Sequence, residues 1–298
     1  MKIYPALTHE LLCGELSSLV SRYPFLTLGS IGQSLVGRDL PLVRLGKGEK
    51  YLLYVATHHA MEWITSVLLL YLVEDFCRAY ESGDALYGAD VRSLLETRTL
   101  CFVPMLNPDG VELHLNGKDD KNPLTDRLLS MSGGDYSRWQ SNGRGVDLNH
   151  NYNADFDAYK ILEPSLGIFG GGPTRYAGTH PESEPESAAL CRFIRQTEPR
   201  LLITLHTQGE EIYADAGGYL PPTASALAAR FSALSGYTVA KPEKAASYGG
   251  LKDWFILEFD RPGFTLECGK GRNPLPYGDA PFIYHRLQQL LLSMPMFI

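Results

Sequence analysis

The stretch Tyr51-Leu52-Leu53-Tyr54-Val55-Ala56 leads directly into Thr57-His58-His59-Ala60-Met61-Glu62-Trp63, and an apolar segment then continues to Val73. A short, continuously apolar run is typical of a strand buried on both faces, and the longer segment after it predicts a helix. In open α/β sheets, ligands bind at the carboxyl ends of the strands. We therefore expect His59 and Glu62 to lie together at a strand-to-helix junction on the binding edge of a sheet.

Two later predicted strands also end in ionisable residues. The strand at 201–205 precedes His206, and the strand at 263–266 precedes Glu267. A single histidine in such a place is usually structural, but a carboxylate is costly to bury without a partner. The three junctions together predict that His59, Glu62 and His206 form an open zinc site with one Zn²⁺ per chain. Glu267 would be the general base that takes a proton from the attacking water, because the metal makes that water more acidic.

The composition narrows the class of protein. The chain has 298 residues, of which 44% are hydrophobic, and a formal net charge of −7. The acidic balance and the scattered basic residues argue against nucleic acid or an anionic membrane as the main partner. The longest apolar stretch, 63–73, is too short to span a bilayer, and residues 1–30 lack a signal-peptide pattern. Five widely spaced cysteines without a C-x-x-C pair suggest reduced thiols. We expect a soluble, cytoplasmic protein.

Strands and helices alternate along the chain. This alternation predicts an α/β sandwich with a largely parallel central sheet, and no linker divides residues 1–298 into more than one domain. Asn107-Pro108-Asp109-Gly110 predicts a turn, and Ser183 with Glu186 predicts a capped helix start. Two long irregular stretches, 116–145 and 163–181, are expected to be functional loops. Helices are predicted at about 9–22, 62–80, 183–197, 223–235, 249–258 and 281–293, and strands at about 25–31, 40–45, 51–56, 99–105, 201–205 and 263–266.

The ordered motifs resemble those of a known enzyme family. They are His59-x-x-Glu62 continued by Trp63-Ile64-Thr65, Asn107-Pro108-Asp109-Gly110, Gly145-Val146-Asp147-Leu148-Asn149, His206 and Glu267. In this order they resemble the zinc carboxypeptidases of the carboxypeptidase A type, over about residues 20–285. The resemblance implies a three-layer sandwich whose mixed, mostly parallel, eight-stranded sheet carries helices on both faces. It also implies that His59, Glu62 and His206 bind zinc and that Glu267 is the base. His58 is an alternative ligand through H-x-x-x-E, but the Trp-Ile-Thr continuation favours His59.

One departure from the family pattern bears on the substrate. Digestive carboxypeptidases have Asn-Arg where this chain has Asn149-His150, and that arginine grips a C-terminal carboxylate in a bidentate manner. The phrases at 142–149, 206–213 and 273–276 instead resemble the bacterial γ-D-glutamyl-L-diamino acid peptidases, which cut murein peptides. The resemblance therefore predicts hydrolysis of the bond between the γ-carboxyl of D-glutamate and a diamino acid such as meso-diaminopimelate.

Other substrate-binding residues are also predicted from the resemblance. Aligning Gly249-Gly250 and Asp253-Trp254 on the family pattern puts Lys252 at the base of the pocket for the leaving residue, where it would favour a carboxylate. Alternatively, Lys252 is a solvated lysine on a helix face. Arg144 is the predicted oxyanion-stabilising arginine, with Arg138 as the alternative. Tyr248 is predicted to lie over the bound substrate.

Three other functions are weighed against this one. The first is a metallocarboxypeptidase that releases C-terminal residues from ordinary peptides, which His150 disfavours. The second is an N-acyl amino acid amidohydrolase, which the two long loops disfavour. The third is a non-catalytic binding protein, which retention of all three ligands and of Glu267 disfavours. The sequence gives no indication of the oligomeric state.

Overall fold

The computed structural model describes residues 1–242 and 244–298. Its centre is an eight-stranded sheet with the strand order β1-β2-β6-β3-β7-β10-β8-β9. The strands are β1 (Thr27–Gln33), β2 (Asp39–Gly46), β3 (Lys50–Ala56), β6 (Arg98–Val103), β7 (Leu201–His206), β8 (Glu211–Tyr213), β9 (Thr238–Val239) and β10 (Gly263–Glu267). The four central strands β6, β3, β7 and β10 run parallel, whereas β2 pairs antiparallel with both β1 and β6, and β8 pairs antiparallel with β10. The predicted mixed, mostly parallel, eight-stranded α/β fold is thus confirmed.

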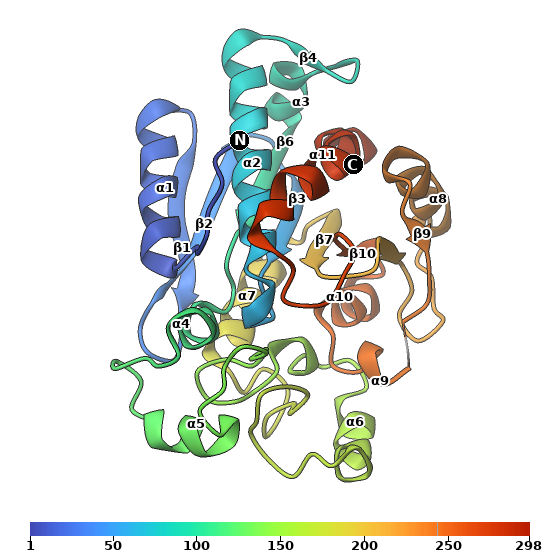
Figure 1. Cartoon of the computed structure of the whole chain (residues 1–298). Coiled ribbons are helices and arrows are strands. Elements are labelled where there is room, and N and C mark those ends of the chain that lie inside the picture. Colours follow the sequence, from blue (N-terminus) through green and yellow to red (C-terminus); the bar gives the residue numbers. More distant parts are fainter. Residues whose placement is uncertain (243) are drawn as a thin grey trace.

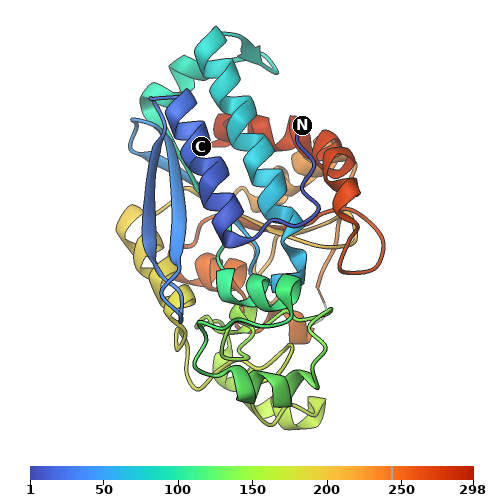
Figure 2. The same ribbon diagram turned by 60° about the vertical axis from the view of Figure 1, so that its left-hand side comes forward.

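Helices cover both faces of this sheet (Figures 1 and 2). One face carries α1 (His9–Arg22), α2 (Ile64–Ser82), α8 (Ala224–Ser235) and α11 (Ala280–Ser293), and their buried side chains join one apolar cluster. The other face carries α7 (Pro185–Thr197) and α10 (Leu251–Phe259), which pack into a second cluster. No described helix is both long enough and apolar enough to cross a membrane.

Strand β3 shows why an apolar run without alternation forms the middle of this sheet. Leu52, Tyr54 and Ala56 point into the first cluster, while Leu53 and Val55 point into the second. All five are fully buried, and burying one aliphatic or aromatic side chain of this size stabilises the fold by about 1.5–3 kcal/mol. The two-sided burial fixes the register of β3 and hence the position of the residues that follow it.

The remaining elements lie around the sheet. In Figure 1, helices α5 and α6 and the loops near them lie below the sheet, on the side where β3 leads into the short helix η1 (Ala60–Glu62). They form a layer over the carboxyl edge of the central strands. The other elements are β4 (Ala85–Leu86), β5 (Ala89–Asp90), α3 (Val91–Thr97), α4 (Pro108–Asn116), α5 (Thr125–Ser132), α6 (Phe156–Leu162), α9 (Lys244–Ser247), η2 (Leu148–His150), η3 (Glu163–Leu166), η4 (Tyr277–Asp279) and η5 (Met294–Phe297).

Three local predictions are wrong. Asn107 does not open an isolated turn: its side chain accepts a hydrogen bond from the Gly110 backbone at 3.0 Å and caps α4, with Pro108 at the first helical position. Ser183 does not cap α7, which begins after Glu184. The Ser183 hydroxyl instead accepts from the Asn151 side chain at 2.8 Å and donates to Glu184. In addition, the stretch 116–145 contains α5 and is not irregular throughout.

Candidate metal centre and active-site cleft

The turn after β3 places two of the predicted ligands. Thr57 adopts a left-handed conformation with φ of 57°, and its backbone N–H donates to the Thr65 hydroxyl at 3.0 Å. That hydroxyl donates in turn to the Glu62 carbonyl at 2.8 Å. His59 occupies the N-cap position of η1, and Glu62 is its last residue. The short helix therefore turns both side chains toward the carboxyl edge of the sheet.

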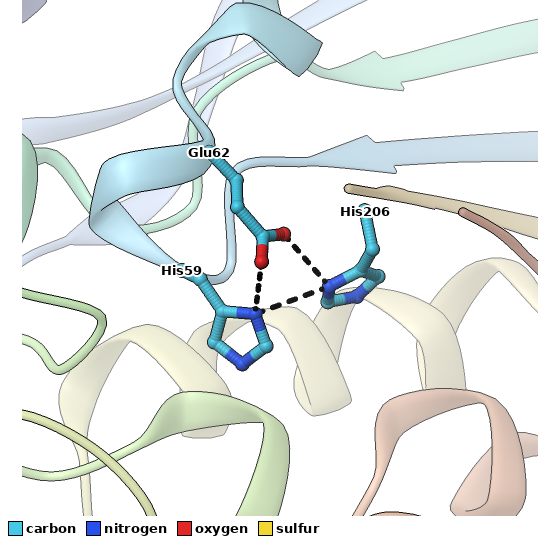
Figure 3. A group of neighbouring side chains, drawn as sticks. All are labelled: His59, Glu62 and His206. Atoms are coloured by element: carbon cyan, nitrogen blue, oxygen red, sulfur yellow. Dashed lines mark hydrogen bonds and ion pairs between the residues drawn. The ribbon is translucent and has the colours of Figure 1, made fainter. Parts of the chain in front are cut away.

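His206 reaches the same place from the neighbouring strand, because it is the last residue of β7 and β7 pairs with β3. Figure 3 shows the three side chains converging. His59 Nδ1 lies 3.1 Å from Glu62 Oε1, and His206 Nδ1 lies 3.2 Å from Glu62 Oε2. The two Nδ1 atoms are 3.3 Å apart. One ligand atom from each residue falls within 4.8 Å of the others. Two imidazole nitrogens and a carboxylate in a largely buried cluster fit Zn²⁺.

The charges of the cluster depend on one another. Burial alone would raise the pKa of Glu62, but the positive charges and hydrogen bonds of His59 and His206 outweigh it and lower the pKa to about 2. Burial would lower the pKa of His59, but Glu62 and Asp147 outweigh it and raise that pKa well above its ordinary value. The site therefore favours a positive charge between these side chains, which a metal ion supplies without protonating the imidazole.

Asp147 supports His59 from outside the cluster. Its Oδ1 lies 3.2 Å from His59 Nε2, and its Oδ2 accepts from the Arg175 backbone N–H at 2.9 Å. The bond to Nε2 fixes the tautomer that leaves Nδ1 free for the metal. Asn273 acts on the other side, donating to the Thr207 carbonyl at 2.7 Å and to Glu62 Oε1 at 3.4 Å. The motif at 145–149 contained Asp147, but neither supporting role was predicted.

Glu267 is the last residue of β10 and lies directly beside His206 in the parallel ladder. Burial, reinforced by the negative charges of Glu62 and Glu211, raises the pKa of Glu267 to about 8, although His59 opposes the shift. The carboxylate lines a cleft of about 270 Å³ together with all three ligand candidates. This is the position that a general base for an attacking water requires.

The cleft also contains most of the predicted substrate-binding residues. Asn149, His150 and Lys252 line it. Gly249, with φ of 71°, lets the segment before α10 approach His150 at the end of η2, because a Cβ there would lie 2.1 Å from the His150 carbonyl oxygen. Tyr248 lies beside a neighbouring hollow, and its backbone carbonyl accepts from His150 Nδ1 at 2.6 Å. Lys252 is only 4% exposed, so its alternative reading as a solvated lysine is wrong.

Two predicted arginines and one histidine lie elsewhere. The Nε of Arg144 is 3.3 Å from Glu184 Oε2, and neither Arg144 nor Arg138 is among the residues that line the cleft. The structure thus does not bring either guanidinium to the metal cluster. His58 is buried, its Nε2 lies 3.1 Å from the Tyr152 hydroxyl, and its ring stacks on that of His206 with centroids 5.3 Å apart, but it does not belong to the group of ligand atoms formed by His59, Glu62 and His206.

Several cleft residues were not predicted. Gln140, Thr174 and Arg175 come from the two long loops, Asp253 from α10, and Asn273 from the segment after β10. The length of the loops was the signal for the first three, but nothing in their local sequence singles out these positions.

A family model described as zinc carboxypeptidase matches residues 13–285. The chain belongs to this family. Its relatives include gamma-D-glutamyl-L-diamino acid endopeptidase 1 of Lysinibacillus sphaericus, which is 33% identical over 96% of this chain and 71% of the relative. The protein YqgT of Bacillus subtilis is 34% identical over 93% of this chain and 74% of YqgT. Among solved structures, carboxypeptidase A from Helicoverpa armigera superposes with a TM-score of 0.74 at 18% identity, over 99% of this chain and 73% of that one. The protein is therefore a zinc metallopeptidase with the carboxypeptidase fold.

Proposed function

We propose that this peptidase hydrolyses the amide bond between the γ-carboxyl of D-glutamate and meso-diaminopimelate, or another diamino acid, in murein peptides. The relative from Lysinibacillus sphaericus, named for this class of bond, supports the proposal. The observation that carries it is a buried pair of opposite charges among the residues that line the cleft, formed by Lys252 and Asp253.

This pair suits the far end of diaminopimelate. Lys252 Nζ donates to Asp253 Oδ1 at 3.0 Å and to the Asp215 carbonyl, which leaves one of its three N–H groups for a ligand. Asp253 likewise retains acceptor capacity. The distal centre of diaminopimelate carries a carboxylate and an ammonium group. A lysine donor beside an aspartate acceptor complements both groups, whereas an apolar side chain would satisfy neither.

His150 stands where digestive carboxypeptidases have the arginine that grips a C-terminal carboxylate. Its Nδ1 is committed to the Tyr248 carbonyl, and its ring stacks on Tyr159 with centroids 4.2 Å apart. Burial lowers the pKa of His150 below its ordinary value. A neutral imidazole that is already hydrogen-bonded cannot replace a guanidinium that grips a carboxylate in a bidentate manner.

The residues divide the chemistry between them. His59, Glu62 and His206 would hold the zinc ion, which supplies Lewis-acid polarisation of the scissile carbonyl and makes the attacking water more acidic. Glu267 takes a proton from that water as its oxygen bonds to the carbonyl carbon. Glu267 then delivers the proton to the amide nitrogen as the C–N bond breaks, so that the amine of the diamino acid leaves. Asp147 keeps His59 in the orientation that holds the metal.

Product analysis tests this proposal. The zinc-loaded protein is incubated with L-Ala-γ-D-Glu-meso-diaminopimelate and, separately, with an α-linked peptide that ends in Phe or Arg. Release of free diaminopimelate, identified by mass, is expected, with slow or no release from the α-linked peptide. Rapid release of Phe or Arg together with an intact murein tripeptide would support the ordinary carboxypeptidase instead. Protein with Glu267→Gln serves as the control for contaminating peptidases.

A further inference from the structure

Arg175 occupies an unusual position at the edge of the cleft. It lies in the loop between η3 and α7, and its backbone is left-handed with φ of 68°. The backbone is held at both ends: its N–H donates to Asp147 Oδ2 at 2.9 Å, and its carbonyl accepts from the Tyr159 hydroxyl at 2.8 Å. A non-glycine residue in this conformation carries strain that the surrounding contacts must support. The anchoring fixes the origin of an exposed side chain that lines the cleft beside His59 and His150.

The guanidinium of Arg175 has no carboxylate of a described residue beside it, and this distinguishes it from the other basic groups that line the cleft. Lys252 is paired with Asp253, and His150 is hydrogen-bonded to the Tyr248 carbonyl. Within residues 1–242 and 244–298, no carboxylate oxygen lies within 4.0 Å of the Arg175 guanidinium. Its charge helps to lower the pKa of His150, which agrees with a position close to that ring. The cleft thus presents an unneutralised cation with five donors.

We infer that Arg175 binds the main-chain carboxylate of the residue that leaves on hydrolysis. Three residues that are predicted to bind the leaving residue lie with it in the cleft, namely Asn149, His150 and Lys252. A planar guanidinium matches a carboxylate with two parallel hydrogen bonds, and an anchored backbone limits the entropy lost on binding. Arg175 then recognises the end of the stem peptide, while Lys252 and Asp253 recognise the side chain. This inference rests on the proposed peptidase site, and it predicts a preference for peptides that end at the diamino acid.

A carboxylate and its carboxamide form the matched probe. L-Ala-γ-D-Glu-L-Lys has one carboxylate on the leaving residue, so its C-terminal carboxamide removes only that charge. The wild-type protein should cleave the acid about 10- to 150-fold faster in kcat/KM than the amide, which is the range for a charge-assisted hydrogen bond. Arg175→Gln should lose this preference through slower cleavage of the acid, and Arg175→Lys should retain part of it. Arg127→Gln, which changes an exposed arginine on α5, should behave as wild type.

Other outcomes overturn the inference in distinguishable ways. Equal losses on acid and amide in Arg175→Gln would show that the residue acts on the structure of the cleft. D-glutamate also has a free carboxylate, so a third substrate carries an α-carboxamide on D-glutamate. Arg175→Gln could cleave this third substrate as fast as the one with a free D-glutamate carboxylate, and still prefer the C-terminal acid to the C-terminal amide. That result would show that Arg175 binds the D-glutamate carboxylate on the acyl side. If no γ-linked substrate is cleaved, the proposed function fails, and the same acid and amide pair on an N-acyl α-dipeptide still tests Arg175.

Discussion

Replacing Lys252 by Met tests how the cleft selects its substrate. The substitution keeps most of the side-chain volume and removes the ammonium that lies 3.0 Å from Asp253, in a pair whose side chains are 4% and 7% exposed. A hydrogen bond from a charged donor to the distal carboxylate of diaminopimelate contributes about 1.5–3 kcal/mol. Its loss corresponds to a decrease of roughly 10- to 150-fold in kcat/KM.

Asp253 responds to the same substitution. Burial raises the pKa of Asp253 to about 6, although Lys252 opposes the shift. Without the lysine this pKa rises further, so in the free variant the carboxyl group is mostly protonated near neutral pH, whereas the ammonium of a bound lysine or diaminopimelate side chain lowers the pKa again, as Lys252 does. Breaking a buried ion pair by removing one partner costs about 3–5 kcal/mol, and protonation of Asp253 offsets part of this loss. The assay is therefore run well below the melting temperature of the variant, with zinc content checked.

The assay compares L-Ala-γ-D-Glu-meso-diaminopimelate with L-Ala-γ-D-Glu-L-Lys. Cleavage before diaminopimelate should fall by the stated factor, and cleavage before lysine much less, because lysine lacks the distal carboxylate. Lys118→Met, at an exposed lysine paired with Asp120, is the matched control and should leave both rates unchanged. Equal losses on the two substrates in Lys252→Met would refute selection by this residue.

Three further predictions concern the metal and the base. Glu267→Gln should keep zinc but lose about 100-fold or more in kcat, and a rate near wild type would exclude Glu267 as the base. Asp147→Asn should weaken zinc binding about 10- to 100-fold in a chelator competition, whereas unchanged affinity would show that the contact with His59 does not orient the ligand. In metal-free protein, the pKa of Glu267 is raised from 4.5 to about 8. The folded state therefore favours the protonated carboxyl group, whose contribution to the free energy of unfolding is complete below about pH 4.5 and is lost as the pH rises through about 8. The melting temperature of metal-free protein should therefore fall between about pH 5 and pH 8.5, and less steeply in Glu267→Gln; identical slopes would contradict the shift.

The parts of the fold that were predictable are those fixed by burial. The run at 51–56 must be shielded on both faces, so it had to be a central strand, and the same reasoning placed β7 and β10. Parallel strands end at one edge, so residues that directly follow them meet in space. That is why His59, Glu62, His206 and Glu267 could be grouped although they are far apart in the chain.

The parts that were missed depend on partners distant in sequence. Ser183 looks like a helix cap, but the Asn151 side chain competes for its hydroxyl. Arg144 was predicted near the metal, yet its guanidinium lies beside the buried Glu184 carboxylate, with Nε 3.3 Å from Oε2. Arg175 reaches the cleft because Asp147 and Tyr159 hold its backbone. Strands β8 and β9 are too short for any periodicity to be seen.

Zinc content measured beside activity tests the central claim most directly, because it asks whether the cluster of His59, Glu62 and His206 is the catalytic metal centre. Purified wild-type protein, His206→Ala and the exposed-site control His285→Ala are dialysed against metal-free buffer and analysed for zinc and for hydrolysis of the murein tripeptide. We predict one zinc per chain and activity in the wild type and the control, and neither in His206→Ala. A His206→Ala protein that retains one zinc per chain and full turnover would contradict the site.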